Sequence, residues 1–174
     1  IQHRGRQVTD NSPLRSGKGS LYEGGIRVPL IVRMPGLTLG GQRCAEPIMC
    51  MDFLPTILEL CGVAATDKAA PKGPLDGLSL VPLLKDPQRK WEQPAITTHG
   101  LGNHALRSER WRYIRYADGG EELYDHWDDP HEWTNLAGKP EVAAVKADLP
   151  RWLPKTDAPN LSDKAKRKNE NKTE

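Results

Sequence analysis

The sequence has little of what marks several common classes of protein. Its 174 residues include one Phe and three Cys, and the formal net charge is +2. This near-neutral balance supplies no basic stripe for nucleic acid, and no run approaches the ~20 apolar residues of a membrane-spanning helix. Cys44, Cys50 and Cys61 lack any CxxC or Cys/His metal spacing, which leaves open one disulfide with a free thiol or three buried thiols.

Proline and glycine are the residues that the chain has in plenty. Fifteen Pro and sixteen Gly indicate a loop-rich chain rather than a helical bundle. The opening stretch "IQHRGRQVTDNSPLRSGKG" has no initiator Met, no apolar signal segment and no clear element of its own. We therefore expect the chain to be a C-terminal piece of a longer protein.

Two segments of the first half carry clear structural patterns. Val28 to Val32 is a continuous apolar run closed by Pro35-Gly36, which predicts a strand buried on both faces of an α/β sheet. The segment "MDFLPTILELCG" predicts a helix capped by Asp52 and ended by Gly62. Its expected buried stripe consists of Leu54, Ile57, Leu58 and Cys61. The later segment "DGLSLVPLLKD" predicts a short apolar turn or helix.

From residue 94 onward, the pattern changes to that of a small antiparallel meander. Strands are expected in 94–100, from Ala105, and in "WRYIRY", where Trp111 and Tyr113 share one face and Ile114 lies on the other. Asp118-Gly119 predicts a hairpin turn into "EELYDH". Together these patterns predict a four-part sheet with its own apolar face.

An amphipathic helix from Glu141 is expected to cover that apolar face. Its stripe consists of Val142, Val145, Leu149, Trp152 and Leu153. Pro150 lies inside the stripe and is expected to kink the helix or end it early. The polar tail from Lys155 is expected to be disordered.

The segment "GKGSLYEGGIRVP" sets Lys18 between two glycines. It is not a phosphate-binding P-loop, because the required upstream Gly and downstream hydroxyl positions hold Ser12 and Gly19. Taken alone, the spacing equally suits turn-forming glycines around a solvated lysine.

Four segments span roughly residues 10 to 153: "PLRSGKGSLYEGGIRVPLIVRMPG", "MDFLPTILELCGV", "DGLSLVPLL" and "ELYDHWDDPHEWTNLAGKPE". In this order they resemble segments of the type I, formylglycine-dependent sulfatases of the alkaline phosphatase superfamily. The resemblance implies an α/β fold class. Residues 1–90 would be the C-terminal part, or edge, of a mixed-sheet catalytic domain. Residues 91–154 would be a small antiparallel sheet with a C-terminal helix, followed by the tail at 155–174.

The resemblance also implies a chemistry. Sulfatases hydrolyse sulfate monoesters with a formylglycine made from Cys or Ser in a C-x-P-x-R or S-x-P-x-R motif, and a divalent cation, usually Ca²⁺, holds the sulfate. Lys18 would contact a sulfate oxygen and help the departing oxygen. Independently of the family, a donor placed where charge develops lowers a barrier by ~3–4 kcal/mol. No such nucleophile motif occurs in this chain, so the nucleophile and most metal ligands are expected upstream of Ile1.

Further candidates are weaker. Asp10 and Asn11 are possible metal ligands, although an Asx-turn is the favoured interpretation. In "TTHGLGNHALR", Asn103, His104 and His99 are candidate substrate-binding residues, with polar turn residues as the equal alternative. Tyr22, Glu23 and Arg27 are expected to anchor the lysine segment, and His126 and His131 are assigned structural roles.

The sequence thus predicts the C-terminal portion of an exported, periplasmic or extracellular sulfatase acting on sulfated carbohydrate or another sulfate ester. The chain alone is expected to be inactive and to need the missing N-terminal part of the same protein. One alternative is a phosphodiesterase or phosphonate monoester hydrolase of the same superfamily. Another, from a different class, is a non-catalytic glycan-binding module built on the antiparallel sheet.

Overall fold

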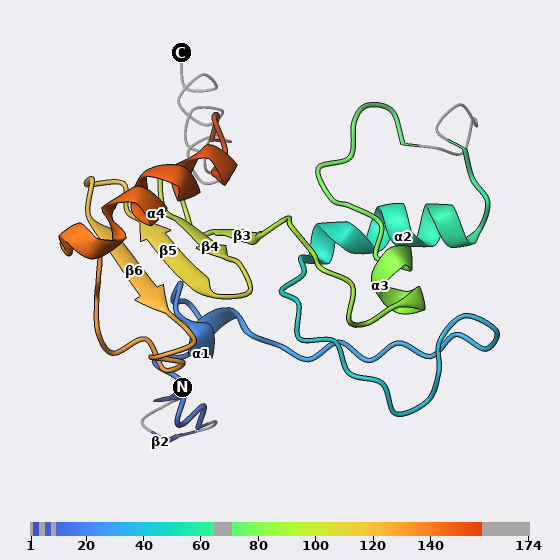
Figure 1. Ribbon diagram of the computed structural model, residues 1–174, viewed down its shortest axis with the longest axis horizontal. Helices are drawn as coiled ribbons and strands as arrows, with labels where there is room; N and C mark the ends of the chain where they lie inside the picture. The colour runs from blue at the N-terminus through green and yellow to red at the C-terminus, as the bar shows by residue number, and fades with distance from the viewer. Residues whose placement is uncertain (1, 4–5, 8–9, 65–70, 158–174) are drawn as a thin grey trace, which may run out of the picture. The chain divides into compact units, whose positions relative to one another are not determined.

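A computed structural model describes residues 2–3, 6–7, 10–64 and 71–157 (Figure 1). The described chain forms two compact units, one made of residues up to Arg27 together with those from Ile96, and the other of Val28–Ala95. The fold is mixed α/β, as the sequence predicted. Among the described residues, no helix has the length and apolar character needed to cross a bilayer.

The first unit is built on a four-stranded sheet. Strands β3 (Ala95–Thr98), β4 (His104–Arg107), β5 (Trp111–Arg115) and β6 (Glu121–Asp125) lie in the order β3-β4-β5-β6. Strand β5 pairs antiparallel with both β4 and β6, so Tyr113 faces Leu106 on one side and Leu123 on the other. The predicted hairpin turn is confirmed, because Gly119 has a φ of 87° and Asp118 accepts a hydrogen bond from the Gly120 amide.

One face of this sheet packs against the C-terminal helical segment. Leu106, Tyr113 and Leu123 form a buried cluster with Leu149 and Leu153. The segment consists of η2 (Pro140–Val142), α4 (Ala143–Asp148) and η3 (Leu149–Trp152), seen in orange and red in Figure 1. The α-helix ends early at Asp148, as Pro150 predicted, but the side chain of Trp152 is exposed rather than part of the core.

The opposite face of the sheet is also covered. Leu21 forms a second buried cluster with Ala105, Ile114 and Tyr124. The short helix α1 (Glu23–Ile26) follows it, and Figure 1 shows α1 and α4 on opposite sides of the sheet. The two-residue strands β1 (Gln2–His3) and β2 (Arg6–Gln7) pair antiparallel before it. The segment that carries Lys18 therefore packs on the small sheet.

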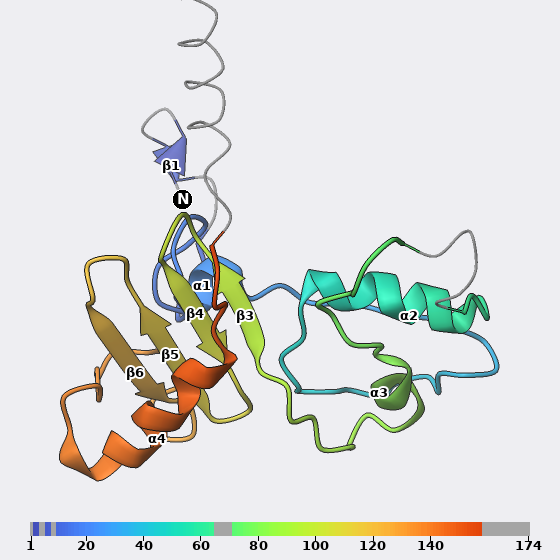
Figure 2. The ribbon, with the colours of Figure 1, turned by 90° about the horizontal axis from the view of Figure 1, so that it is seen from above.

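The second unit contains η1 (Cys50–Asp52), α2 (Phe53–Leu60) and α3 (Val81–Lys85) (Figure 2). Helix α2 ends at Leu60, and the predicted stop residue Gly62 follows the C-cap with a φ of 67°, while the Val63 amide donates to the Leu58 carbonyl. Asp52 does not cap α2 with its side chain. Its carboxylate instead accepts hydrogen bonds from the amides of Met49 at 2.7 Å and Leu78 at 2.9 Å.

Three further expectations for the second unit are wrong for the described residues. The predicted strand at Val28–Val32 is absent, and Val28 and Ile31 are 78% and 90% exposed. A strand needs a neighbour to complete its hydrogen bonds, and no described segment pairs with this one. The stripe on α2 is not buried either, since Leu54 and Ile57 are exposed. All three cysteines are free and exposed.

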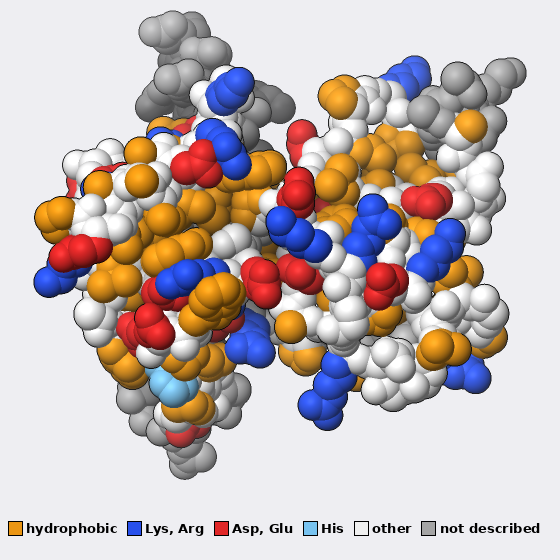
Figure 3. Space-filling view, in the orientation of Figure 1, with side chains coloured by type: hydrophobic (Ala, Val, Ile, Leu, Met, Phe, Trp, Pro, Cys, Tyr) orange, Lys and Arg blue, Asp and Glu red, His pale blue; other side chains and the backbone are white. Residues whose placement is uncertain are grey.

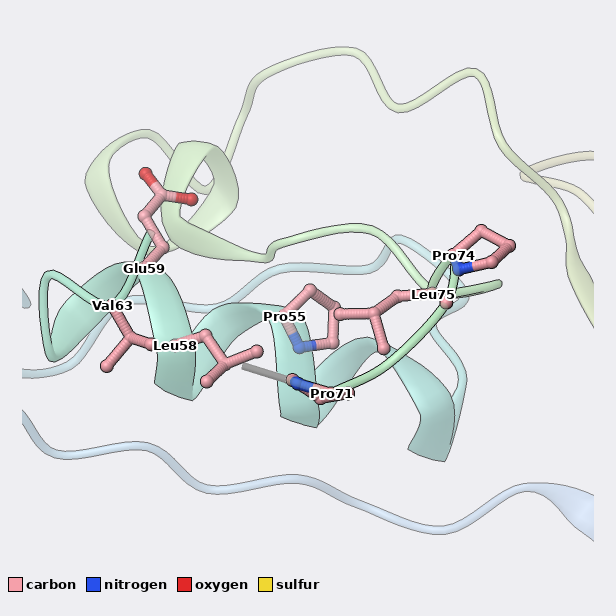
Figure 4. Close-up of a pocket in the computed structure, with 8 residues that line it drawn as sticks. Pro55, Leu58, Glu59, Val63, Pro71, Pro74 and Leu75 are labelled. Carbon is pink, nitrogen blue, oxygen red and sulfur yellow. The ribbon is translucent and has the colours of Figure 1, made fainter. Parts of the chain in front are cut away.

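The second unit therefore exposes much apolar surface. Figure 3 shows hydrophobic side chains gathered on the visible face of the unit that carries α2. A cavity of about 470 Å³ lies between α2 and the chain at 71–75, lined mainly by Pro55, Leu58, Val63 and Leu75. In Figure 4, Glu59 points away from Pro71, so the cavity offers almost no polar group to a ligand.

Candidate functional site

Residues 16–22, which we call the lysine loop, present Lys18 at the tip of a turn. The amide and hydroxyl of Ser20 donate to the Gly17 carbonyl at 3.2 and 2.9 Å, which closes the turn. Gly19 has a φ of 93°, a conformation that side-chain-bearing residues rarely adopt. Lys18 is exposed, and no described residue pairs with its ammonium group. The loop thus offers an uncommitted cation to an anionic ligand.

Two later glycines let the chain fold back against the loop. A Cβ on Gly24 would lie 2.4 Å from the Arg15 carbonyl oxygen, and one on Gly25 would lie 2.4 Å from that of Ser20. The amide of Gly24 donates to the Arg15 carbonyl at 3.1 Å. The Gly24-Gly25 pair is therefore required by close packing of backbone on backbone.

Arg15 anchors the start of the loop to the sheet unit. Its Nη1 donates to the hydroxyl of Tyr124 at 2.8 Å and to the main-chain carbonyl of Glu132 at 2.6 Å. The guanidinium also lies 4.0 Å from the ring centroid of Tyr22. Burial raises the pKa of the Tyr124 hydroxyl, which stays protonated and donates to Glu122. The Tyr124 hydroxyl is therefore a neutral acceptor for the hydrogen bond from Arg15.

Glu23 anchors the end of the loop. Its amide donates to Glu132 Oε2 at 2.7 Å, and its carboxylate accepts a hydrogen bond from Arg112. Arg112 is 1% exposed and reaches Glu132 Oε1 with its Nε at 2.8 Å. The anchoring role that the sequence suggested for Glu23 is confirmed. Arg27 adds an exposed ion pair with Glu23 at 3.6 Å.

Glu132 is the most enclosed member of this group, with 0% exposure. His126 Nε2 lies 2.9 Å from its Oε1, so His126 has the structural role assigned to it. Burial raises the pKa of the Glu132 carboxyl, but the hydrogen bond with His126 and the charge of Arg112 outweigh burial and hold that pKa below its usual value. The carboxylate is therefore ionised at neutral pH.

Glu23, His126 and Glu132 place ligand-type atoms within 4.8 Å of one another. They do not suit the Ca²⁺ that the family resemblance implies. Calcium takes six to eight oxygen ligands, whereas here two carboxylates converge and the buried guanidinium of Arg112 already bridges them. The described residues of this chain form an ion-pair network at this place and supply no calcium cage.

Asp10 and Asn11 have structural partners. Asp10 Oδ1 accepts hydrogen bonds from the amide of Ser12 at 2.9 Å and from its hydroxyl at 2.7 Å, which confirms the Asx-turn. The hydroxyl is the larger cause of the lowered pKa of Asp10. Asn11 Nδ2 donates to the Gly24 carbonyl at 2.5 Å and so supports the fold-back of the lysine loop. Metal binding by this pair stays a prediction.

The candidates around β3 and β4 also have partners within the fold. His104 is buried, with Nδ1 2.9 Å from Thr98 Oγ1 and Nε2 3.1 Å from Asp157 Oδ1. Asn103 Oδ1 accepts a hydrogen bond from the Ala117 amide at 3.1 Å. His99 is exposed, and its amide donates to the Asn103 carbonyl. Their proposed contact with substrate stays a prediction, and none of them joins the lysine loop.

Sequence reasoning missed Arg15, Arg112 and Glu132. One signal could have found Arg112. The strand alternation places it on the same face as Ile114 and opposite to Tyr113. A charged residue on a buried face needs a buried partner. The partners lie 89 and 20 residues away in the chain, and nothing local identifies them.

The sequence of this chain is similar to those of known proteins. Residues 17–158 match the family model described as N-sulphoglucosamine sulphohydrolase, C-terminal. A sulfatase of Formosa agariphila is 37% identical over 145 residues, which cover 81% of this chain and 26% of that protein. The chain spans about a quarter of the length of the curated relatives it matches.

Solved structures agree on the fold. The protein Ps i-CgsB, in complex with k-i-k-neocarrahexaose, matches 82% of this chain and 31% of its own with a TM-score of 0.65 and 25% identity. The phosphonate monoester hydrolase of Silicibacter pomeroyi matches 78% of this chain and 29% of its own with a TM-score of 0.58 and 28% identity. The match of the family model begins at Gly17, within the lysine loop.

Proposed function

This chain belongs to the family of N-sulphoglucosamine sulphohydrolase C-terminal domains, and on that premise we propose that it is the C-terminal part of a sulfatase in which Lys18 acts on the substrate. The observation that carries the proposal is an exposed ammonium group that no described residue pairs with, at the tip of a loop with both ends fixed. An ammonium held in this way suits an anionic ester.

The role of Lys18 follows from the charge changes of sulfate ester hydrolysis. A sulfate monoester carries one fixed negative charge, and further negative charge develops on the leaving oxygen as the S–O bond breaks. The Nζ group of Lys18 can donate hydrogen bonds to a sulfuryl oxygen and to that leaving oxygen. Because the second interaction strengthens as the bond breaks, it lowers the barrier of the chemical step.

The nucleophile and the metal are proposed to come from outside this chain. The chain contains no C-x-P-x-R or S-x-P-x-R motif, and its described residues form no calcium cage. A formylglycine would provide the nucleophile, and Ca²⁺ would neutralise the sulfate. We propose that the remaining three quarters of a relative-sized protein supply both, and that this chain alone is inactive.

The exposed apolar residues of the second unit fit the same proposal. Val28, Ile31 and Ile57 are exposed, and soluble proteins rarely leave large apolar patches uncovered unless another surface binds there. We propose that they pack against the rest of the catalytic domain, where the segment 28–32 would gain the neighbouring strand that the described chain lacks.

Substitution of the lysine in the full-length protein tests the function. Lys18→Ala is expected to lower kcat for an aryl sulfate by 100- to 1000-fold, the effect of losing one well-placed donor. Lys85→Ala, at an exposed lysine at the end of α3, is the matched control and should leave kcat within twofold. Equal activity of the Lys18→Ala and wild-type proteins would refute the role of Lys18.

A related hydrolase activity is the second candidate. The fold match to the phosphonate monoester hydrolase of Silicibacter pomeroyi favours it, since a phosphonate monoester presents a similar anion to Lys18. The ratio of kcat/KM for a matched aryl sulfate and aryl phosphonate in the full-length protein distinguishes the two. A ratio above one supports a sulfatase.

The substrate class and location are part of the same proposal. The structural relative Ps i-CgsB was solved with k-i-k-neocarrahexaose, which supports a carbohydrate as substrate here. The family model supplies the expectation that this carbohydrate carries a sulfate ester. The family resemblance supports export to the periplasm or beyond. A purely glycan-binding module is the alternative of another class. It would bind a sulfated glycan equally well after Lys18→Ala and would show no hydrolysis in the full-length protein.

A further inference from the structure

We propose that Glu132 is a positioning residue for Lys18, because it holds both ends of the lysine loop at once. This inference rests on the proposed function of Lys18. Glu132 lies 114 residues after Lys18 in the sequence. It belongs to the loop that follows β6.

The two attachments use different parts of the same residue. The main-chain carbonyl of Glu132 accepts the hydrogen bond from Arg15 at 2.6 Å, immediately before the loop. Its carboxylate accepts the hydrogen bond from the Glu23 amide at 2.7 Å, immediately after the loop. The positions of the two ends are therefore fixed relative to one residue. The conformation of the seven residues between them depends on these two fixed ends.

The electrostatic environment makes this attachment stiff. Arg112 donates to both Glu132 and Glu23, and all three side chains are at least nine-tenths buried. Charge-assisted hydrogen bonds of this kind are about twice as strong as neutral ones and weaken less with salt when buried. The carboxylate of Glu132 needs all its partners, since a buried charge without them is costly.

The backbone of Glu132 adds a further restriction. Its φ is 62°, in the left-handed region that non-glycine residues seldom occupy. This conformation directs the carbonyl toward Arg15 while the side chain turns back toward Glu23 and Arg112. A catalytic group displaced by about 1 Å can lose a factor of 100 in rate. The precision of Lys18 therefore depends on this residue although the two do not touch.

Glu132→Gln is the variant that tests the proposal in the full-length protein. The amide keeps the volume but replaces one acceptor oxygen with an NH₂ group, which must then face the N–H of Glu23 or the Nε–H of Arg112. If the NH₂ group faces Glu23, the bond to the Glu23 amide is lost. If it faces Arg112, the bond to the guanidinium that also holds the Glu23 carboxylate is lost. Either orientation weakens the hold on the end of the loop. The matched control is Glu121→Gln on β6, which breaks an ion pair with Lys146 of 2.9 Å and has no described contact with the lysine loop.

Tryptic cleavage after Lys18 reports directly on the mobility of the loop, with cleavage after the exposed Lys155 as internal reference. Glu132→Gln is expected to raise the Lys18-to-Lys155 cleavage ratio by about tenfold, and Glu121→Gln to leave it within twofold. Should Glu132→Gln fail to fold, Arg15→Gln releases the other end of the loop without altering the buried carboxylates and must give the same rise. An unchanged ratio in the folded variant overturns the proposal.

A kinetic double-mutant cycle separates positioning from general damage. Glu132→Gln alone is expected to lower kcat by 10- to 100-fold, while in the Lys18→Ala background the same change should alter kcat by less than twofold. Equal factors in both backgrounds would show that Glu132 acts independently of Lys18 and would overturn the proposal. If Lys18→Ala itself leaves kcat unchanged, the proposed function fails, and the cleavage ratio still judges whether Glu132 holds the loop.

Discussion

Arg112 is the residue whose surroundings most restrict what can replace it. It is 1% exposed and forms ion pairs with two carboxylates, those of Glu23 and Glu132. Arg112→Met preserves much of the side-chain volume but leaves both carboxylates buried without their shared counter-charge. We expect the free energy of unfolding to fall by about 3–5 kcal/mol, measured by urea denaturation.

Arg110→Met is the companion measurement. Arg110 also pairs with a carboxylate, Asp125, but its side chain is 38% exposed. Partly solvated pairs contribute little, so the loss should be much smaller than that of Arg112→Met. Equal losses for the two arginines would contradict the account of the buried network.

Glu132 gives the network a dependence on pH. The pKa of its carboxyl is below the ordinary value of 4.5 in the folded protein. As the pH falls, this carboxyl is therefore protonated at a higher pH in the unfolded chain than in the folded protein. The free energy of unfolding should therefore be maintained above pH 4.5 and should decrease as the pH drops below it. Urea denaturation between pH 6 and 3 measures this decrease, and Glu132→Gln should make it shallower. A steeper decrease in the variant would refute the assignment.

At the residue scale, the sequence predicted what depends on local chemistry. Lys18 between two glycines, the turn at Asp10 and the helix stop at Gly62 all show in a few neighbouring residues. Arg112 and Glu132 do not, because a strand residue and a loop residue become partners only after the sheet has formed. Alternation in "WRYIRY" showed that Arg112 shares a face with Ile114, but periodicity cannot tell which charged residue meets it.

The lysine loop and α1 form the element on which the site depends. A Cβ at Gly24 would lie 2.4 Å from the Arg15 carbonyl oxygen, so Gly24→Ala must push the fold-back apart. We expect a loss of about 1–3 kcal/mol in the free energy of unfolding and a rise in tryptic cleavage after Lys18.

Gly138→Ala is the control for the same chemical change. The added methyl group at Gly138 meets nothing within 4 Å. Its effect should be within about 0.5 kcal/mol. A loss at Gly24 no larger than that at Gly138 would show that the fold-back does not need a glycine.

Elements defined by local pattern were predicted well, and one that depends on neighbours was not. The meander, its Asp118-Gly119 turn and helix α2 each carry their own periodicity and end signals. The run Val28–Val32 reads as a buried strand because its residues are apolar, but burial and pairing require other segments. The described chain offers none, so its side chains are exposed.

At the scale of the whole molecule, the division of the chain matters. The described residues up to Arg27 belong with the sheet from Ile96, while Val28–Ala95 forms a separate compact unit. The sequence order alone could not reveal this, since the attachment of the lysine loop runs through contacts more than 100 residues apart. The domain boundaries inferred from the sequence stay a prediction for the complete protein.

The exposed apolar surface gives a prediction for the full-length protein. Ile31→Asp should lower its stability by about 2 kcal/mol or more, because a charge would then enter the proposed contact with the rest of the catalytic domain. Ala144→Asp, on the exposed side of α4, should have almost no effect. Thermal unfolding of the two variants makes the comparison, and equal melting temperatures would argue against the proposed contact.

The central claim is that Lys18 stabilises the leaving oxygen of a sulfate ester. The most direct test is the ratio of kcat/KM between wild-type and Lys18→Ala full-length protein for aryl sulfates whose phenols differ in pKa. A poorer leaving group carries more charge that needs stabilisation. We therefore predict that the ratio grows steadily as the pKa of the phenol rises. A ratio that stays near one, or that is the same for every phenol, would contradict the claim.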